Sequence, residues 1–137
     1  MSKESALLYA FINIGLGPDG GASWLLSRQV GYSKALEIAT EGKRVMGEEC
    51  FKLGLTNKLV ESDEILSVAK NWAIDLSKKP TIGIGITKQD MIFSLNNDLL
   101  DTIEYEAKEQ VAAFHSEDLK EGVSAFLEKR KANFKGK

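Results

Sequence analysis

One acidic side chain lies in a turn whose residue types could hold it for chemistry. Residues 16–23 read Leu-Gly-Pro-Asp-Gly-Gly-Ala-Ser. Pro18 fixes its own φ, and Gly20 and Gly21 allow positive φ, so the turn is expected to be stiff. A carboxylate held on a stiff turn is a candidate general acid/base, which makes Asp19 a candidate catalytic residue. The same sequence is also common where the aspartate only bonds its own backbone or caps a helix.

Composition limits what else the chain can do. It has 137 residues, 43% of them hydrophobic, and a net charge of −2. That is enough for one domain with a core, and it argues against a nucleic-acid partner. Cys50 is the single cysteine and His115 the single histidine, so neither an internal disulfide nor a histidine-based metal site is predicted. No apolar stretch reaches the roughly 20 residues of a membrane span. A cytoplasmic location, without a membrane partner, is expected.

The elements that must position Asp19 are mostly helices. The apolar run from Ala6 to Ile14 suits a buried strand or a short buried helix, and its β-branched and aromatic residues favour a strand covered on both faces. Apolar spacing and capping signals predict helices elsewhere. The expected helices are 23–28, 33–41, 47–53, a helix from Ser62 bounded by Pro80, 81–95, 99–114 and a last one from Ser116; a short strand is expected over 55–60. The fold class predicted is mainly α, with a strand and turn in 1–22 and helices in 23–137.

The order of these signals resembles the crotonase, or enoyl-CoA hydratase/isomerase, superfamily. The turn itself, Ile14-Gly15-Leu16-Gly17-Pro18-Asp19-Gly20-Gly21-Ala22, is one of the similar segments. The others are Leu26–Gly31, Ala35–Gly42, Glu48–Lys58 with its Gly-Leu-Thr-Asn pattern, Pro80 ahead of a helix holding Lys88, and Asp118–Phe134. Together they cover nearly the whole chain in order.

The resemblance is to the C-terminal half of that family only. It implies the helical oligomerisation region of the crotonase fold with a short remnant of the ββα spiral. No Ala-Gly-x-Asp loop and no Gly-Gly-Gly helix start occurs here, so both loops that form the family's oxyanion hole are missing from the match. The implied partners are an acyl-CoA thioester and further copies of the chain, in a trimer or a dimer of trimers. The implied cofactor is none, with coenzyme A as part of the substrate. The chain alone is expected to be inactive or nearly so.

The resemblance also assigns roles at the turn. In isomerase-type and dehalogenase-type members an aspartate at the position of Asp19 acts as proton shuttle or nucleophile. The second glutamate of hydratases would fall near Phe11, which is not a carboxylate and argues against simple hydratase chemistry. Leu16, Pro18 and Trp24 are candidate substrate contacts, although core packing is the simpler role for Trp24.

A second pair of candidates lies near the C-terminus. The resemblance implies that Phe126 and Lys129 contact the coenzyme A nucleotide in a neighbouring subunit's site. Their i, i+3 spacing predicts that they share a helix face. The alternative is a core Phe126 and a solvated Lys129.

Several further expectations follow from the residue types alone. The rest of the basic tail is expected to be solvated, Arg28 to pair with a carboxylate, and Cys50 to be buried. His115 is expected at a loop or helix end. The rival function for the whole chain is a non-catalytic helical oligomerisation module.

Overall fold

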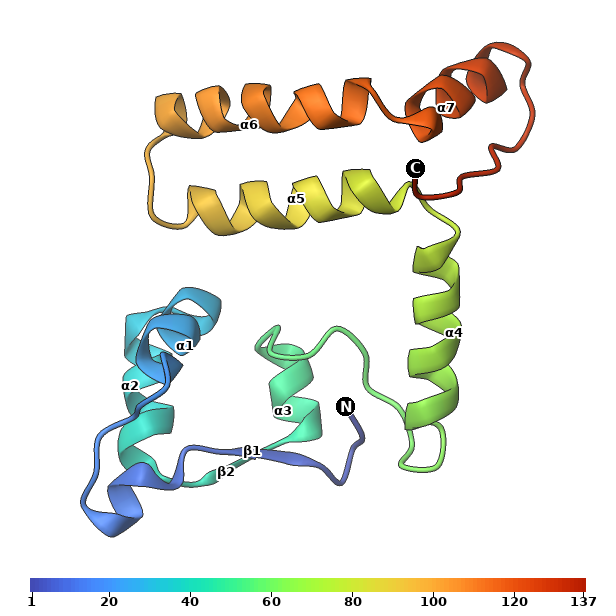
Figure 1. Cartoon of the computed structure of the whole chain (residues 1–137). Coiled ribbons are helices and arrows are strands. Elements are labelled where there is room, and N and C mark those ends of the chain that lie inside the picture. Colours follow the sequence, from blue (N-terminus) through green and yellow to red (C-terminus); the bar gives the residue numbers. More distant parts are fainter. The chain divides into compact units, whose positions relative to one another are not determined.

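The computed structural model describes all of residues 1–137 and divides into two compact units, Met1–Val68 and Ala69–Lys137 (Figure 1). Its secondary structure is seven α-helices, one 3-10 helix and a two-stranded sheet, which confirms the mainly α fold class. Helix α4, Ile65–Ser77, begins in the first unit and continues into the second. The separate division predicted at residue 22, between spiral remnant and helical region, stays a prediction.

The sheet of the first unit is short. Strand β1, Ala6–Leu8, pairs antiparallel with β2, Arg44–Met46, and Leu7 lies opposite Val45. The sequence favoured a strand for the whole apolar run, but the rest of it forms the 3-10 helix η1, Ala10–Ile14, none of whose residues is buried. The reason is that β2 offers a partner for only three residues, and an unpaired strand leaves its backbone groups without hydrogen bonds.

Two further strand predictions need correction. The sequence did not predict β2, because three residues are too few for an alternating pattern. The strand predicted over 55–60 is absent, and only an isolated bridge between Ser2 and Val60 forms there. The short helix predicted at Gly47 is confirmed as α3, Gly47–Lys52. A side chain at Gly47 would collide with the backbone oxygen of Ser2.

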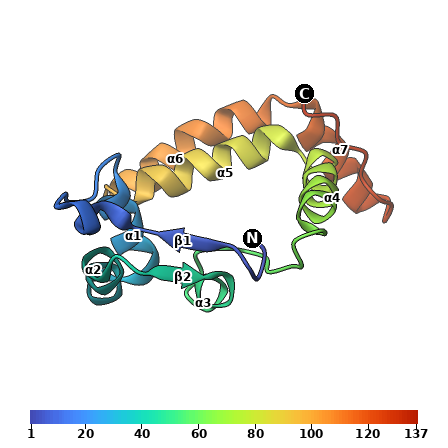
Figure 2. The ribbon, with the colours of Figure 1, turned by 90° about the horizontal axis from the view of Figure 1, so that it is seen from below.

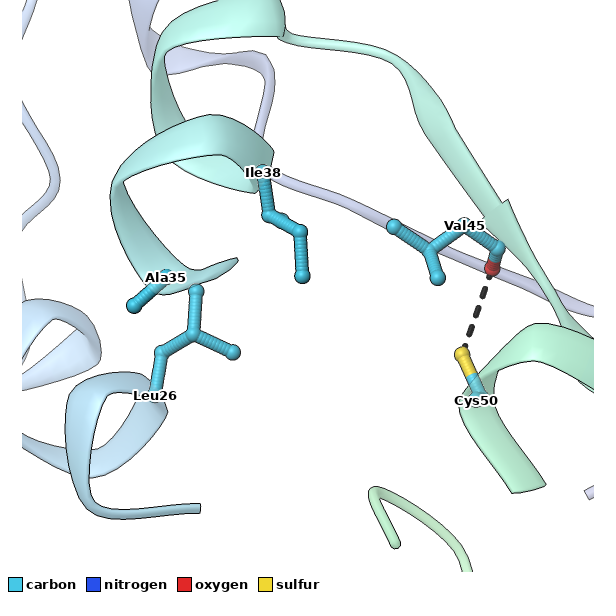
Figure 3. Packing of buried hydrophobic residues seen from close by; sticks show 5 residues of the cluster. All are labelled: Leu26, Ala35, Ile38, Val45 and Cys50. Atoms are coloured by element: carbon cyan, nitrogen blue, oxygen red, sulfur yellow. Dashed lines mark hydrogen bonds between the residues drawn. The ribbon is translucent and has the colours of Figure 1, made fainter. Parts of the chain in front are cut away.

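The core of the first unit joins helices to this sheet. Its buried members are Leu26, Ala35, Ile38, Val45 and Cys50, and Figure 3 shows their side chains facing a common interior. Cys50, 1% exposed, donates a 3.3 Å hydrogen bond from its Sγ to the Val45 carbonyl. The prediction that Cys50 is buried is therefore confirmed.

The helices around the candidate turn are α1, Ala22–Val30, and α2, Tyr32–Glu41. Gly31 is the N-cap of α2, so this helix begins one residue before the expected start at residue 33. Contrary to expectation, Arg28 does not pair with a carboxylate. Its guanidinium lies 3.8 Å from the centre of the Trp24 ring, because four residues along α1 place the two side chains on one face.

The second unit contains a helical hairpin and a terminal helix. Helices α5, Thr81–Ser94, and α6, Leu99–Phe114, lie side by side (Figures 1 and 2). The rings of Phe93 and Tyr105 stack with centroids 4.0 Å apart and join them. The last helix, α7, spans Glu117–Leu127 and begins as predicted, since the Ser116 hydroxyl accepts a hydrogen bond from Leu119 N at 3.0 Å.

The apolar stripes of these helices are largely uncovered within the chain. Helix α4 has no buried residue. On α6, the apolar residues Val111 and Phe114 are exposed, and 66% of Phe114 is accessible. Apolar spacing along a helix identifies such a stripe but does not say what covers it. No helix is both long enough and apolar enough to span a bilayer.

Candidate functional site

The turn that carries Asp19 is built from glycines in the left-handed region. Helix η1 ends at Gly15, with φ 79°, and Gly20 and Gly21 have φ of 58° and 82° just before α1. The Asp19 carbonyl accepts a 2.9 Å hydrogen bond from Ala22 N, which closes the turn onto the helix. The positions that need positive φ are therefore the positions that hold glycine.

The Asp19 carboxylate itself is exposed and makes no hydrogen bond or ion pair. The N-cap of α1 is Gly21, so the carboxylate does not cap the helix. The backbone of the turn does the structural work, and the acid is left free for another role.

A pocket of about 440 Å³ opens beside this turn, between η1, the turn, α1 and α2. Leu16 and Pro18, two of the predicted substrate contacts, line it. Asp19 is not a lining residue but directly follows two, Gly17 and Pro18. Trp24 does not line the pocket, and its ring instead packs against Arg28. The structure thus brings Leu16 and Pro18 together around one space and leaves Trp24 outside it.

Most of the pocket surface is apolar, with hydroxyl groups spread around it. The hydroxyls belong to Tyr9, Ser23, Ser27, Tyr32 and Thr40. Sequence reasoning missed Tyr32 and Leu36, which line the pocket from α2. The signal was present, because Tyr32, Leu36 and Ala39 follow an i, i+4, i+7 spacing that places them on one helix face. Such a pocket suits an apolar group of small-molecule size.

The second candidate pair lies in the other unit, at the end of α7. Phe126 is 82% exposed, so it is not a core residue of this chain. The helix ends at Leu127, and Lys129 follows its C-cap. The argument that Phe126 and Lys129 share a helix face is therefore wrong. The two residues are joined by a turn instead, in which Lys129 N donates to the Phe126 carbonyl at 3.2 Å.

This turn has the Schellman geometry, with an unusual residue at its left-handed position. Arg130 N donates to the Ala125 carbonyl at 3.0 Å, and Lys129 has φ 54°. Lys129 is the only residue other than glycine with positive φ in the chain. A side chain at such a position costs about 1–2 kcal/mol relative to glycine.

Ion pairs hold the segment that follows. The Arg130 guanidinium forms two hydrogen bonds to the Glu121 carboxylate, at 2.6 and 3.0 Å, and a third at 2.6 Å to Glu128. The Glu121 carboxylate also accepts a 2.8 Å hydrogen bond from Asn133 N. Arg130 and this amide lower the pKa of Glu121 to about 2.

The C-terminal tail is fastened to α7 as well. Asp118, 3% exposed, accepts hydrogen bonds from Lys135 N at 2.7 Å and Gly136 N at 2.8 Å. The basic side chains of the tail, Lys131, Lys135 and Lys137, are exposed as predicted. Its backbone is not free, because carboxylates of α7 accept hydrogen bonds from its amides. The lysine content of the tail does not predict these contacts, since they involve its main chain.

With both regions described, comparison with known proteins identifies the family. The enoyl-CoA hydratase/isomerase family model matches residues 1–137, and the chain belongs to that family. The 1,2-epoxyphenylacetyl-CoA isomerase of Escherichia coli is 34% identical over 136 residues, which cover 99% of this chain and 52% of that protein. The crotonyl-CoA hydratase of Syntrophomonas wolfei is 32% identical over 123 residues, covering 90% of this chain and 47% of that protein.

Solved structures agree. An enoyl-CoA hydratase of Mycobacterium tuberculosis superposes with a TM-score of 0.91 at 28% identity, over 99% of this chain and 54% of that one. The chain therefore has a crotonase fold in part, and it spans about half the length of the relatives it matches.

Proposed function

We propose that this chain forms the C-terminal part of an enzyme that moves a proton on an acyl-CoA thioester, with Asp19 as the acid/base. The observation that carries the proposal is a free, exposed carboxylate on a glycine-built turn, beside an apolar pocket, in a member of the enoyl-CoA hydratase/isomerase family. Leu16 and Pro18 would contact the acyl group.

The proposed reaction shifts a double bond. The thioester acidifies its α-carbon, and the Asp19 carboxylate removes a proton there to leave an enolate conjugated with the β,γ double bond. The same carboxyl group then returns the proton at the γ-carbon, so that the double bond lies between the α- and β-carbons and Asp19 is again ionised. No cofactor is consumed. Because Phe11 supplies no second carboxylate, we propose isomerase rather than hydratase chemistry.

The enolate needs donors that hold its oxygen, which are typically the largest electrostatic contribution to such a reaction. The resemblance assigns those donors to loops outside the half that this chain matches. We therefore propose that residues 1–137 alone turn over little or no acyl-CoA. Phe126 and Lys129 would contact the nucleotide end of coenzyme A, in a trimer or dimer of trimers, with a ring for the base and an ammonium for phosphate.

The exposed apolar side chains on α4 and α6 also favour a second function, a non-catalytic oligomerisation module. Size-exclusion chromatography and a coenzyme A titration separate the two. An oligomer that does not bind coenzyme A supports the module, whereas binding supports the acyl-CoA enzyme.

The catalytic role is tested by Asp19→Asn in the whole enzyme of which this chain is proposed to form the C-terminal part. We expect kcat for a 3-enoyl-CoA to fall by about 100-fold to 10,000-fold, the range for loss of a general acid/base. Asp63→Asn is the matched control, because Asp63 is an exposed carboxylate of the same unit away from the turn, and its kcat should be unchanged. Full turnover by Asp19→Asn would remove the assignment.

A further inference from the structure

The turn after α7 holds a residue in a conformation that its own side chain disfavours. Lys129 has φ 54°, where glycine is usual, yet the two Schellman hydrogen bonds are formed. A disfavoured backbone conformation persists when surrounding contacts impose it. The question is which contacts impose this one.

Two acidic side chains, Glu128 and Glu121, bind the Arg130 guanidinium that follows Lys129, and Glu121 also binds further along the segment. Glu121, one-quarter exposed, lies on α7 two turns before Lys129 and binds the segment after it at two points. It receives two hydrogen bonds from the Arg130 guanidinium and one from the amide of Asn133. A bidentate guanidinium–carboxylate pair fixes orientation as well as distance. Residues on both sides of Lys129 are thus fastened, by α7 before it and by Glu121 after it.

We infer that Glu121, acting through Arg130, is a positioning residue that holds Lys129 in its left-handed conformation and so orients its side chain for a phosphate of coenzyme A. This inference rests on the proposed nucleotide contact of Phe126 and Lys129. Glu121 touches no substrate atom in this scheme. Its role is to fix the backbone from which the Lys129 ammonium extends.

The pairing also explains how an acid is tolerated near a proposed phosphate site. An unpaired carboxylate would repel phosphate, whereas Arg130 neutralises Glu121 and itself brings positive charge. A purely electrostatic role and a positioning role of Glu121 predict opposite changes in the affinity for phosphate when the charge of Glu121 is removed. Loss of a negative charge alone should strengthen binding of an anion, and loss of positioning should weaken it.

The test is an NMR titration of the 137-residue chain with coenzyme A and with adenosine 3′,5′-bisphosphate, which lacks the pantetheine arm. Glu121→Gln is expected to raise both dissociation constants by about fivefold, against the sign of its charge change. Arg130→Lys keeps the positive charge but loses the bidentate hydrogen bonding of the guanidinium, and it should raise both dissociation constants in the same way. Glu104→Gln removes an equal charge from an exposed pair with Lys108 and should not weaken binding.

A double-mutant cycle shows whether Glu121 acts through Lys129. In a Lys129→Gln background, Glu121→Gln should no longer weaken binding. An equal loss in both backgrounds, or unchanged or tighter binding in Glu121→Gln and Arg130→Lys alone, overturns the inference. If Lys129→Gln binds both probes as well as the native chain does, or the native chain binds neither, the proposed nucleotide contact itself fails and the inference falls with it.

Discussion

The two candidate regions each turn the chain with a residue of positive φ, but they reach that conformation by different means. The turn at Asp19 uses Gly20 and Gly21, for which the conformation carries no side-chain strain. The turn after α7 uses Lys129 and is held by Arg130 and Glu121. The first is specified by the residue types of the turn itself, and the second depends on a contact between side chains nine residues apart. The difference teaches that a strained turn needs external support, while a glycine turn supplies its own.

The variant with the largest expected effect replaces both glycines of the turn at Asp19. Gly20→Ala with Gly21→Ala is expected to lower the free energy of unfolding by about 2–4 kcal/mol, because each alanine must adopt a left-handed conformation. Gly17→Ala is the matched control, since Gly17 has no positive φ and has open space around it. Chemical denaturation measures both. A double variant as stable as the native chain would show that the turn does not depend on its glycines.

The second test removes the strain from the other turn. Lys129→Gly is expected to raise the free energy of unfolding by about 1 kcal/mol, because glycine adopts positive φ without cost. Lys129→Ala keeps the Cβ and should leave stability nearly unchanged. Thermal unfolding distinguishes the two variants. If Lys129→Gly is no more stable than Lys129→Ala, the left-handed turn is not strained and the contrast between the regions is lost.

The smallest expected effect is a pH dependence of the free energy of unfolding that comes from the turn after α7. The pKa of Glu121 falls from 4.5 to about 2 on folding, so its ionised form stabilises the folded state. This contribution is complete above about pH 4.5 and is lost as pH falls towards 2. Unfolding measured across this range should show a shallower pH dependence in Glu121→Gln than in the native chain. Identical slopes would mean that the Glu121–Arg130 pair does not contribute.

Sequence reasoning succeeded where a local signal sufficed. The bounds of α6 agree with the expected helix over 99–114, and Ser116 caps α7 as predicted. His115 lies at the C-cap of α6, as expected of a helix-end residue. The order of motifs was enough to recognise the family, which the match over the whole chain confirms.

The failures share a cause. The end of β1 and the binding of the tail to Asp118 both depend on partners that no local pattern identifies. Tyr32 and Leu36 line the pocket because α2 lies across from η1 and the turn, which helical spacing alone does not reveal.

The sequence by itself determined which residues form helices, where glycines permit a turn, and that Asp19 stands on such a turn, because these depend on backbone preferences and spacing along one chain. Only the tertiary structure decided that the Asp19 carboxylate is free, that a pocket opens beside it, and that Glu121 reaches Arg130 to support Lys129. Those features depend on how side chains and segments lie in space, and their geometry exists only after the segments have packed.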